Sequence, residues 1–243
     1  MQRYFINKDN ILNNQIKISG NDFHHIKNVM RMSVGDIVIL NTFDGLVYEA
    51  LLIEFNKNDV VFEIKKVLKN TYKPFNLTLG LSMIKKDNFE LVLQKATELG
   101  VEAILPLITE RSIIKIDDFS KKISRYETII KEASEQSERT VLLIIHDLTS
   151  LNAIDLQPYN KLILCYAREK SYKLTELIME IEPTDKVLAL IGPEGGFTQK
   201  EIDFLISKGF VSVSLGQTIL RAETAAMYIA SILKARMEEN IWK

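Results

Sequence analysis

The chain has 243 residues, of which 47% are hydrophobic and 26% are charged, which is an ordinary globular composition. Its net charge of −1 excludes a generally basic binder of polyanions, so any nucleic-acid site must be a local patch. The single cysteine, Cys165, excludes an internal disulfide and a cysteine-based zinc site, and its apolar neighbours predict a buried thiol. No apolar run approaches the roughly 18–20 residues that span a bilayer, and the first residues do not resemble a signal peptide. We therefore expect a soluble, cytoplasmic protein with no membrane partner.

Residues 1–72 have the pattern of a small β-rich domain. Short apolar runs alternate with turn pairs, which favours a small sheet or barrel. The predicted strands are 37–40, 46–53 and 60–64, and the predicted turns are Asp44-Gly45 and Asn58-Asp59. One helix is predicted over residues 21–30, with Asn21 as its N-cap.

A polar motif, His24 to Arg31, overlaps this helix. Adjacent histidines cannot face the same way on a helix and no cysteine or third histidine is near, so we expect no metal site. One histidine is expected to be partly buried and the other exposed. His25, Asn28 and Arg31 are three residues apart and would share a helix face, which is equally consistent with an RNA contact and with a solvated surface. Arg3, Lys27 and Arg31 are the candidates for phosphate contact in this region.

From residue 73 to residue 243 apolar strands alternate with amphipathic helices, which predicts an α/β domain with a largely parallel sheet. The predicted strands are 76–81, 103–107, 161–166, 186–191 and 211–215. The predicted helices are 87–100, 119–138, 173–180, 199–208 and 222–237. Asp87 is expected to cap the first of these helices and Gly100 to end it.

Two strands of this region run into glycine-containing loops. The first loop, Gly192 to Phe197, precedes a helix that Thr198 and Glu201 should open as a capping box. Ligands of open α/β sheets bind at such strand ends, although a plain tight turn has the same pattern. The loop lacks the glycine spacing of dinucleotide and phosphate-loop motifs. The second loop begins after Leu215, and Arg221 and Glu223 flank the helix that follows; by themselves they are more typical of a local salt bridge or cap.

Taken together, these stretches resemble the bacterial 16S ribosomal RNA uridine N3-methyltransferases, of the trefoil-knot (SPOUT) superfamily. The matching signatures are Arg3-Tyr4-Phe5, His24 to Arg31, Gly35-Asp36, Gln94 to Val101, Pro106 with Glu110-Arg111-Ser112, Glu132 to Gln136, Ile191 to Phe197, and Leu215 to Ala225. The resemblance implies a PUA-like RNA-binding β-barrel at 1–72 and a knotted α/β methyltransferase domain at 73–243. It also implies S-adenosylmethionine as cofactor, 16S ribosomal RNA or the small subunit as partner, and a homodimer.

The resemblance, together with the chemistry of methyl transfer, also assigns residues. Arg221 would be catalytic, stabilising negative charge on the base, and Glu194 or Glu223 would accept the proton or orient the arginine. RNA would be held by Arg3, His25, Lys27, Arg31 and Arg139. The cofactor-binding residues would be Tyr166, Ala167, Leu190, Ile191, Gly192, Pro193, Gly195, Gly196, Leu215, Gly216, Ile219, Leu220, Thr224 and Ala225.

The chain departs from the family pattern at two positions. Thr218 stands where the family usually has an arginine, and Glu138 stands where it often has a glycine. These departures bear on RNA contacts or dimer packing and leave the cofactor assignment unchanged. Two alternatives stay open: a knotted methyltransferase that acts on another RNA such as tRNA, and a non-catalytic RNA-binding protein of ribosome assembly. A sugar- or nucleotide-modifying α/β enzyme is a more distant third.

Overall fold

The computed structural model describes residues 1–112, 119–170 and 172–238. It divides into two compact units. Unit 1 comprises residues 1–73 and 134–142, and unit 2 comprises residues 74–133 together with the chain from residue 143 onward. The sequence placed residues 134–142 in the second domain, whereas in the structure they pack with the first.

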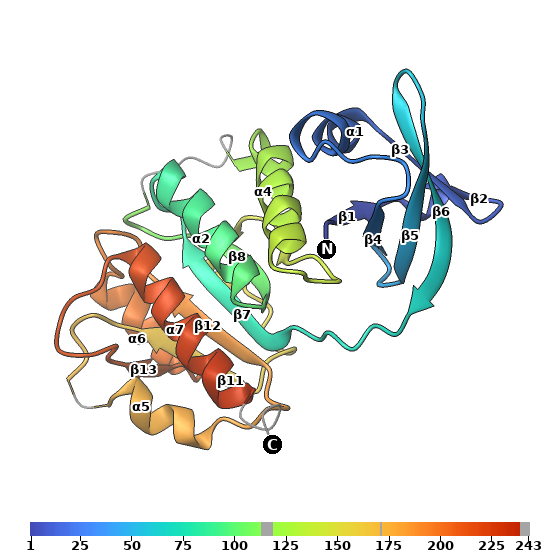
Figure 1. Ribbon diagram of the computed structural model, residues 1–243. Coiled ribbons are helices and arrows are strands. Elements are labelled where there is room, and N and C mark those ends of the chain that lie inside the picture. The colour runs from blue at the N-terminus through green and yellow to red at the C-terminus, as the bar shows by residue number, and fades with distance from the viewer. Residues whose placement is uncertain (113–118, 171, 239–243) are drawn as a thin grey trace. The chain divides into compact units, whose positions relative to one another are not determined.

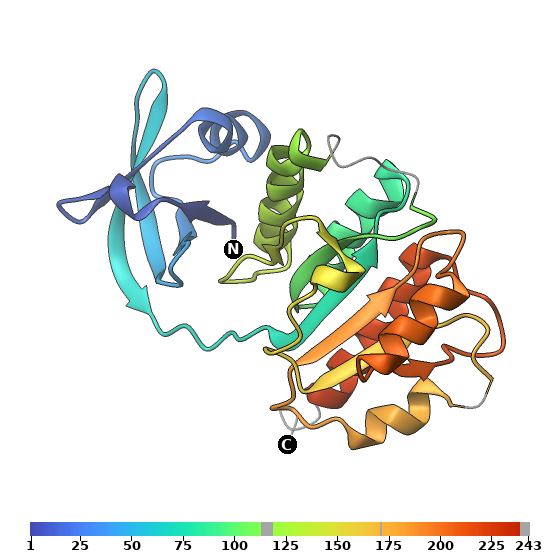
Figure 2. The same cartoon turned by 180° about the vertical axis from the view of Figure 1, so that it is seen from behind.

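Unit 1 is built on a curved, six-stranded sheet that forms a half-barrel (Figures 1 and 2). Its strands are β1 (Arg3–Ile6), β2 (Ile11–Leu12), β3 (Gln15–Ser19), β4 (Ile37–Thr42), β5 (Val47–Phe55) and β6 (Asp59–Leu68), in the order β1-β4-β5-β6-β3-β2. β1 pairs with β4 in parallel and the other pairs are antiparallel. Alternate residues such as Ile16, Leu52 and Phe62 point inward and are fully buried, so the period-two apolar pattern closes one core. The three predicted strands are confirmed, and β1, β2 and β3 are additional.

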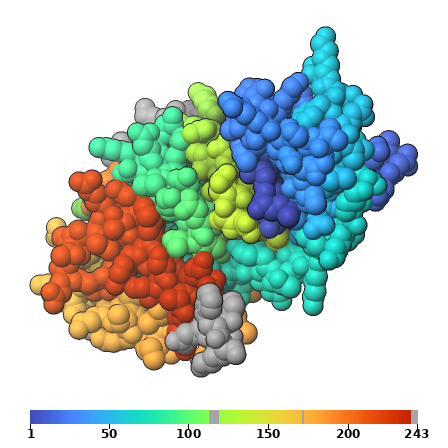
Figure 3. Space-filling model, in the orientation of Figure 1, coloured from blue at the N-terminus to red at the C-terminus, as the bar shows by residue number. Residues whose placement is uncertain are grey.

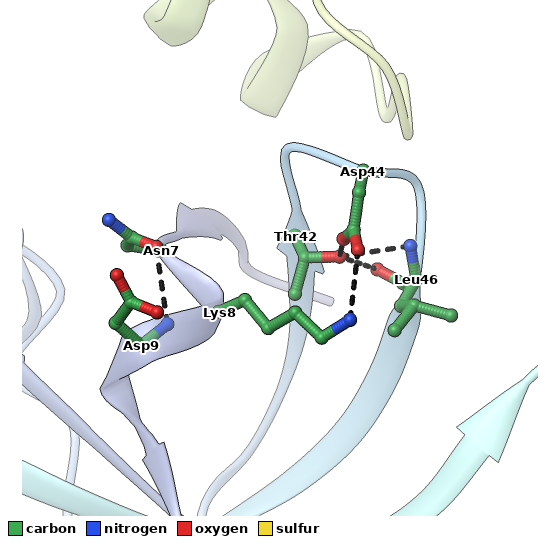
Figure 4. A network of polar contacts seen from close by, with 6 residues as sticks. All are labelled: Asn7, Lys8, Asp9, Thr42, Asp44 and Leu46. Carbon is green, nitrogen blue, oxygen red and sulfur yellow. Dashed lines mark hydrogen bonds and ion pairs between the residues drawn. The ribbon is translucent and has the colours of Figure 1, made fainter.

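The Asp44-Gly45 turn predicted between β4 and β5 is confirmed and is held by side chains (Figure 4). The Thr42 hydroxyl donates to the Asp44 carboxylate, and the Leu46 amide donates to the Thr42 hydroxyl at 3.0 Å. Lys8 Nζ approaches Asp44 at 3.2 Å from the turn that follows β1. Gly45 has φ +89°, a left-handed conformation that favours glycine.

The helix predicted over residues 21–30 differs from the structure in form and start. It consists of α1 (Gly20–His24) and a π-helix, η2 (His25–Val29), in which the Met30 amide donates to the His25 carbonyl. Ser19 occupies the N-cap position without a side-chain bond, so the predicted Asn21 cap is wrong. Arg31 follows in a left-handed conformation with φ +51°, so His25, Asn28 and Arg31 do not share the predicted α-helical face. His24 is exposed and His25 partly buried, as expected.

Unit 2 contains a parallel sheet, as the sequence predicted. Its strands are β7 (Phe75–Ser82), β8 (Val101–Ile108), β9 (Ile144–Ile145), β10 (Thr149–Ser150), β11 (Lys161–Cys165), β12 (Val187–Ile191) and β13 (Val211–Val213). The main order is β10-β8-β7-β12-β11-β13, and β9 also pairs with β8. Because the paired strands are parallel, their carboxyl ends lie along one edge of the sheet.

Helices cover both faces of this sheet. The helices in this part of the chain are α2 (Lys86–Glu98), α4 (Ile123–Gln136), α5 (Leu174–Leu177), α6 (Gln199–Ser207) and α7 (Ala222–Met237), with short 3-10 turns at Leu151–Ala153 and Ile178–Glu180. In α4, Tyr126 packs against Phe89 of α2. A further 3-10 turn, Lys8–Asn10, lies in unit 1. α2 and α7 lie side by side (Figures 1 and 3). Ile202 and Leu205 of α6 share a hydrophobic cluster with leucines of β11 and β12. In the described part of the chain no helix combines the length and apolar character needed to cross a membrane.

Three predicted helix boundaries in unit 2 need correction. Lys85, and not Asp87, occupies the N-cap position of α2, without a side-chain bond. The long helix was predicted over 119–138, whereas α4 begins at Ile123 and ends at Gln136. The helix predicted over 173–180 is divided into α5 and a 3-10 turn. Gly100, with φ +87°, follows the end of α2, and the Thr198–Glu201 capping box opens α6, both as predicted. The knot itself stays a prediction.

Candidate active site in unit 2

Three loops of unit 2 converge at the carboxyl edge of the sheet. Cys165, the last residue of β11, lies opposite Ile191 of β12 and Val213 of β13, so the loops that follow these strands start side by side. They line a cavity of about 780 Å³. This volume is in the range of pockets that hold small-molecule ligands and cofactors.

The loop after β12 presents its backbone to the cavity. The Gly196 amide donates to the Pro193 carbonyl at 2.8 Å, which closes a tight turn, and Gly196 has φ +66°. A Cβ on Gly192 would come within 3.1 Å of the Phe197 ring, so this glycine lets the ring close over the strand end. By contrast, a Cβ on Gly196 would point into open space. The loop is therefore packed on one side and open on the other.

Residues that follow β7 and β8 (Val101–Ile108) support this loop. Arg111 Nη1 donates to the Gly195 carbonyl at 2.7 Å, and the Lys85 amide donates to Glu194 Oε1 at 3.2 Å. Lys85, Asn88 and Arg111 all line the cavity, although the sequence assigned none of them to the site. Arg111 lay in a family signature, but only the strand order β8-β7-β12 brings it to the glycine loop.

The loop after β13 supplies the charged groups at the start of α7. Gly216 has φ +135°, and a Cβ there would also meet no atom within 4 Å. Arg221 is the N-cap residue of α7, makes no side-chain capping bond and is exposed. Glu223 lies in the first turn of α7, where the helix dipole favours a carboxylate. Its Oε2 atom is shielded from solvent and has no hydrogen-bond partner among the residues that the structure describes.

The cavity brings together most of the residues that the sequence proposed. Arg221, Glu194 and Glu223 all line it. Of the proposed cofactor residues, those that line it are Tyr166, Ala167, Ile191, Gly192, Pro193, Gly195, Gly196, Leu215, Gly216, Ile219, Leu220 and Ala225. Leu190 and Thr224 do not: Leu190 is fully buried in the core of the sheet, and Thr224 is exposed on α7.

Cys165, at the base of the cavity, is buried as the sequence predicted. Burial raises the pKa of its thiol to about 12, because the charged thiolate is poorly solvated there. At neutral pH it is therefore a protonated, weakly reactive thiol. In the described part of the chain, His, Cys, Asp and Glu side chains form no group of three that could hold a metal ion.

In unit 1, two of the proposed RNA contacts are engaged within the fold. Arg139 is only 1% exposed, donates from Nε to the Val141 carbonyl and lies over the Tyr72 ring. Its predicted contact with RNA is wrong for this reason. Arg3 donates to Asn41 Oδ1 at 3.2 Å and approaches Glu138 at 3.7 Å, and burial lowers its pKa.

The other three candidates differ in their exposure. His25 Nδ1 lies 3.0 Å from the Tyr4 hydroxyl, so one of its ring nitrogens is already occupied. Lys27 Nζ lies 5.3 Å from the centre of the Phe23 ring, and both Lys27 and Arg31 are exposed. These two cations are the candidates whose charge faces solvent.

Comparison with known proteins agrees with this architecture. The RNA methyltransferase domain family matches residues 71–234, and the RNA methyltransferase PUA domain family matches residues 18–65. The ribosomal RNA small subunit methyltransferase E of Bacillus subtilis is 34% identical over 98% of both chains. A crystal structure of a protein of the same name from Neisseria gonorrhoeae, bound to S-adenosylmethionine, has a TM-score of 0.83 and 29% identity over 99% of this chain and 98% of that one. A Legionella pneumophila structure with bound S-adenosylmethionine has a TM-score of 0.82 and 31% identity, covering 96% of each chain. The chain belongs to the RNA methyltransferase family that includes the ribosomal RNA small subunit methyltransferases E, with a PUA-like domain ahead of a SPOUT-like methyltransferase domain.

Proposed function

We propose that this protein transfers a methyl group from S-adenosylmethionine to N3 of a uridine in 16S ribosomal RNA. The observation that carries the proposal is the cavity of unit 2, where two open glycine loops meet an arginine and a carboxylate at the start of α7. The names of the relatives, which act on small-subunit ribosomal RNA, give the substrate class. Uridine N3 rests on the motif resemblance.

The residues present fit the cofactor. Gly196 and Gly216 both line the cavity and have open space where a side chain would stand, so a flat ligand can approach their backbone. The remaining wall combines apolar groups such as Leu215 and Leu220 with backbone amides and carbonyls, as is common in cofactor pockets. Residues 191–196 and 215–220 would hold the adenosine part chiefly through their backbone. When bound, S-adenosylmethionine supplies an electrophilic methyl group on a sulfonium sulfur.

The chain's own residues would then act on the uracil. N3 becomes nucleophilic as its proton leaves, and negative charge develops on the neighbouring carbonyl oxygens. The exposed guanidinium of Arg221 would stabilise that charge, since a fixed cation at the developing anion lowers the barrier.

Glu223 is the better candidate for the proton acceptor. The carboxylate of Glu194 already accepts the backbone amide of Lys85, which is a structural use. Glu223 lines the same cavity, and one of its oxygens is shielded from water and unpartnered within the described part of the chain. A carboxylate with a free lone pair in a partly dry site can accept a proton within hydrogen-bond reach.

Access to N3 sets a condition on the RNA. N3 lies on the pairing edge of uracil, so the target nucleotide must be unpaired or turned out of its stack. Unit 1 would hold the surrounding RNA, with His25, Lys27 and Arg31 as contacts and Arg3 in a supporting position. We also propose a homodimer, on the strength of the family resemblance.

Methyl transfer from labelled S-adenosylmethionine to small ribosomal subunits that lack their native methylation tests the proposal. We expect label in 3-methyluridine after nucleoside analysis, and much less label in the same time with the Arg221→Ala variant. Label in another nucleoside would refute the assigned position. Unlabelled subunits, with label in tRNA offered in a parallel reaction, would favour the first alternative. Cofactor binding without transfer to either RNA would favour a non-catalytic role.

A further inference from the structure

The cavity of unit 2 has an excess of positive charge in a region that is otherwise slightly acidic. Residues 73–243 contain 22 Lys and Arg against 24 Asp and Glu, a net of −2. The charged residues that line the cavity are Lys85, Arg111, Arg168, Arg221, Glu194 and Glu223, so four cations face two carboxylates, a local net of +2. A concave site with a charge excess concentrates ligands of the opposite charge.

Two of these cations have neither a structural contact nor a catalytic role proposed above. The Arg111 guanidinium is used on the Gly195 carbonyl, and Arg221 is the proposed catalytic cation. Lys85 and Arg168 are exposed, and neither side chain forms an ion pair or hydrogen bond among the described residues. By contrast, Lys86, one residue after Lys85, pairs with Glu90 at 3.7 Å.

The topology places these two cations on either side of the glycine loop. Lys85 follows β7 and Arg168 follows β11, and these two strands flank β12 in the sheet. The loop after β12 therefore lies between two loops that each present an unpaired cation to the same cavity. A nucleotide whose base enters this cavity brings a phosphate on its 5′ side and another on its 3′ side.

We propose that Lys85 and Arg168 bind the backbone phosphates that flank the target nucleotide, which gives the methyltransferase unit its own RNA site. This inference rests on the proposed function, because it assumes that the base enters the cavity. It adds a positioning role: phosphate contacts fix the register of the strand, while the groups around Arg221 act on the base. The occupant is the phosphodiester backbone of RNA, and the carboxylate of the cofactor is the competing anion that the test must exclude.

The test measures binding of a fluorescent, uridine-containing single-stranded RNA to the full chain over a series of salt concentrations. Each phosphate contact on single-stranded nucleic acid contributes about 0.7 to the slope of log K against log salt. The double variant Lys85→Ala/Arg168→Ala should therefore lose about 1.4 of that slope. Lys186→Ala is the matched control, because Lys186 is an exposed cation directly before β12, at the opposite edge of the sheet.

Calorimetric titration with S-adenosylmethionine separates the two anions. We expect the Kd of S-adenosylmethionine to change less than about twofold in the double variant. The charge-conserving double variant Lys85→Arg/Arg168→Lys should keep the salt slope of the wild type for RNA binding. An unchanged slope, no RNA binding by the wild type, or a selective loss of cofactor affinity would each overturn the inference. Labelling of 3-methyluridine by the wild type is measured in parallel, to keep the two proposals apart. If the wild type transfers the methyl group but the double variant has an unchanged salt slope, only the phosphate site is refuted. If the slope of the double variant falls but the wild type transfers no methyl group, only the proposed reaction is refuted.

Discussion

Glu223→Gln is the substitution that separates chemistry from binding most cleanly in this site. The amide has nearly the shape of the carboxylate and can keep one acceptor oxygen, but it cannot take up a proton from N3. Loss of a general base costs about 100-fold or more in turnover, which is about 2.7 kcal/mol in the barrier. We therefore expect kcat to fall by at least about 100-fold.

The same substitution should not destabilise the fold. Glu223 Oε2 is shielded from water and has no partner in the described part of the chain, and an unpaired charge in such a place costs more than the neutral amide of glutamine. The position of Glu223 in the first turn of α7 offsets part of this cost, about 0.3–1 kcal/mol. Removing the charge should thus leave the thermal midpoint unchanged or raise it by about 2–4 °C for each kcal/mol gained. A residue kept for stability would give the opposite result.

The assay combines single-turnover methyl transfer with calorimetric titration of S-adenosylmethionine and of its demethylated product, which lacks the sulfonium charge. Proton acceptance predicts a slow transfer step with both affinities unchanged. If Glu223 instead pairs with the positive sulfonium, Glu223→Gln weakens binding of the cofactor but not of the product. That result, together with near-wild-type transfer at saturating cofactor, would refute the reasoning.

Three further outcomes follow from the geometry. Arg221→Ala should keep cofactor affinity but lose most turnover, measured by titration and single-turnover transfer; wild-type rates would remove Arg221 from the mechanism. Arg139→Ala should lower the free energy of unfolding by about 2–4 kcal/mol, measured by urea denaturation, because it empties a buried site in unit 1. Since burial raises the pKa of Cys165 to about 12, the thiol should resist alkylation at about pH 8 in the native protein and react in urea. Rapid alkylation of the native protein would contradict the burial. The raised pKa also means that the free energy of unfolding should fall as the pH rises from the pKa of the unfolded thiol toward about 12.

Hydrophobic periodicity predicted the main strands and helices of unit 2, but it missed the two-residue strands β9 and β10. The apolar runs that became β7, β11 and β12 are buried on both faces, and a parallel sheet needs such continuous runs. α7 begins and ends where its spacing predicted, at Ala222 and Met237. In unit 1 the sequence did not predict β1 and β3. These strands are only four and five residues long, and polar residues interrupt their apolar pattern.

Caps and helix types were less predictable, because they depend on local geometry that a residue type permits without requiring. Asn21 and Asp87 are good capping residues, yet the N-cap of each helix lies two residues earlier, at Ser19 and Lys85. The π-helix at His25–Val29 has no signature in sequence, and it removes the three-residue spacing on which a shared face of His25, Asn28 and Arg31 depended.

The site was predictable where it is made of backbone and unpredictable where it depends on which strands are neighbours. Glycines in the loops after β12 and β13 are conspicuous because these loops need conformations and close approaches that other residues resist, so Gly196 and Gly216 were found from sequence. Lys85 and Arg111 are ordinary surface cations until the order β8-β7-β12 brings their loops beside the glycine loop. Arg139 shows the converse: its charge suggested a phosphate contact, but the segment 134–142 packs into unit 1 and buries the guanidinium. A cation in this chain is therefore a candidate for RNA only if the fold leaves its charge both exposed and unpaired, and around the cavity Lys85 and Arg168 meet that condition without another assigned role.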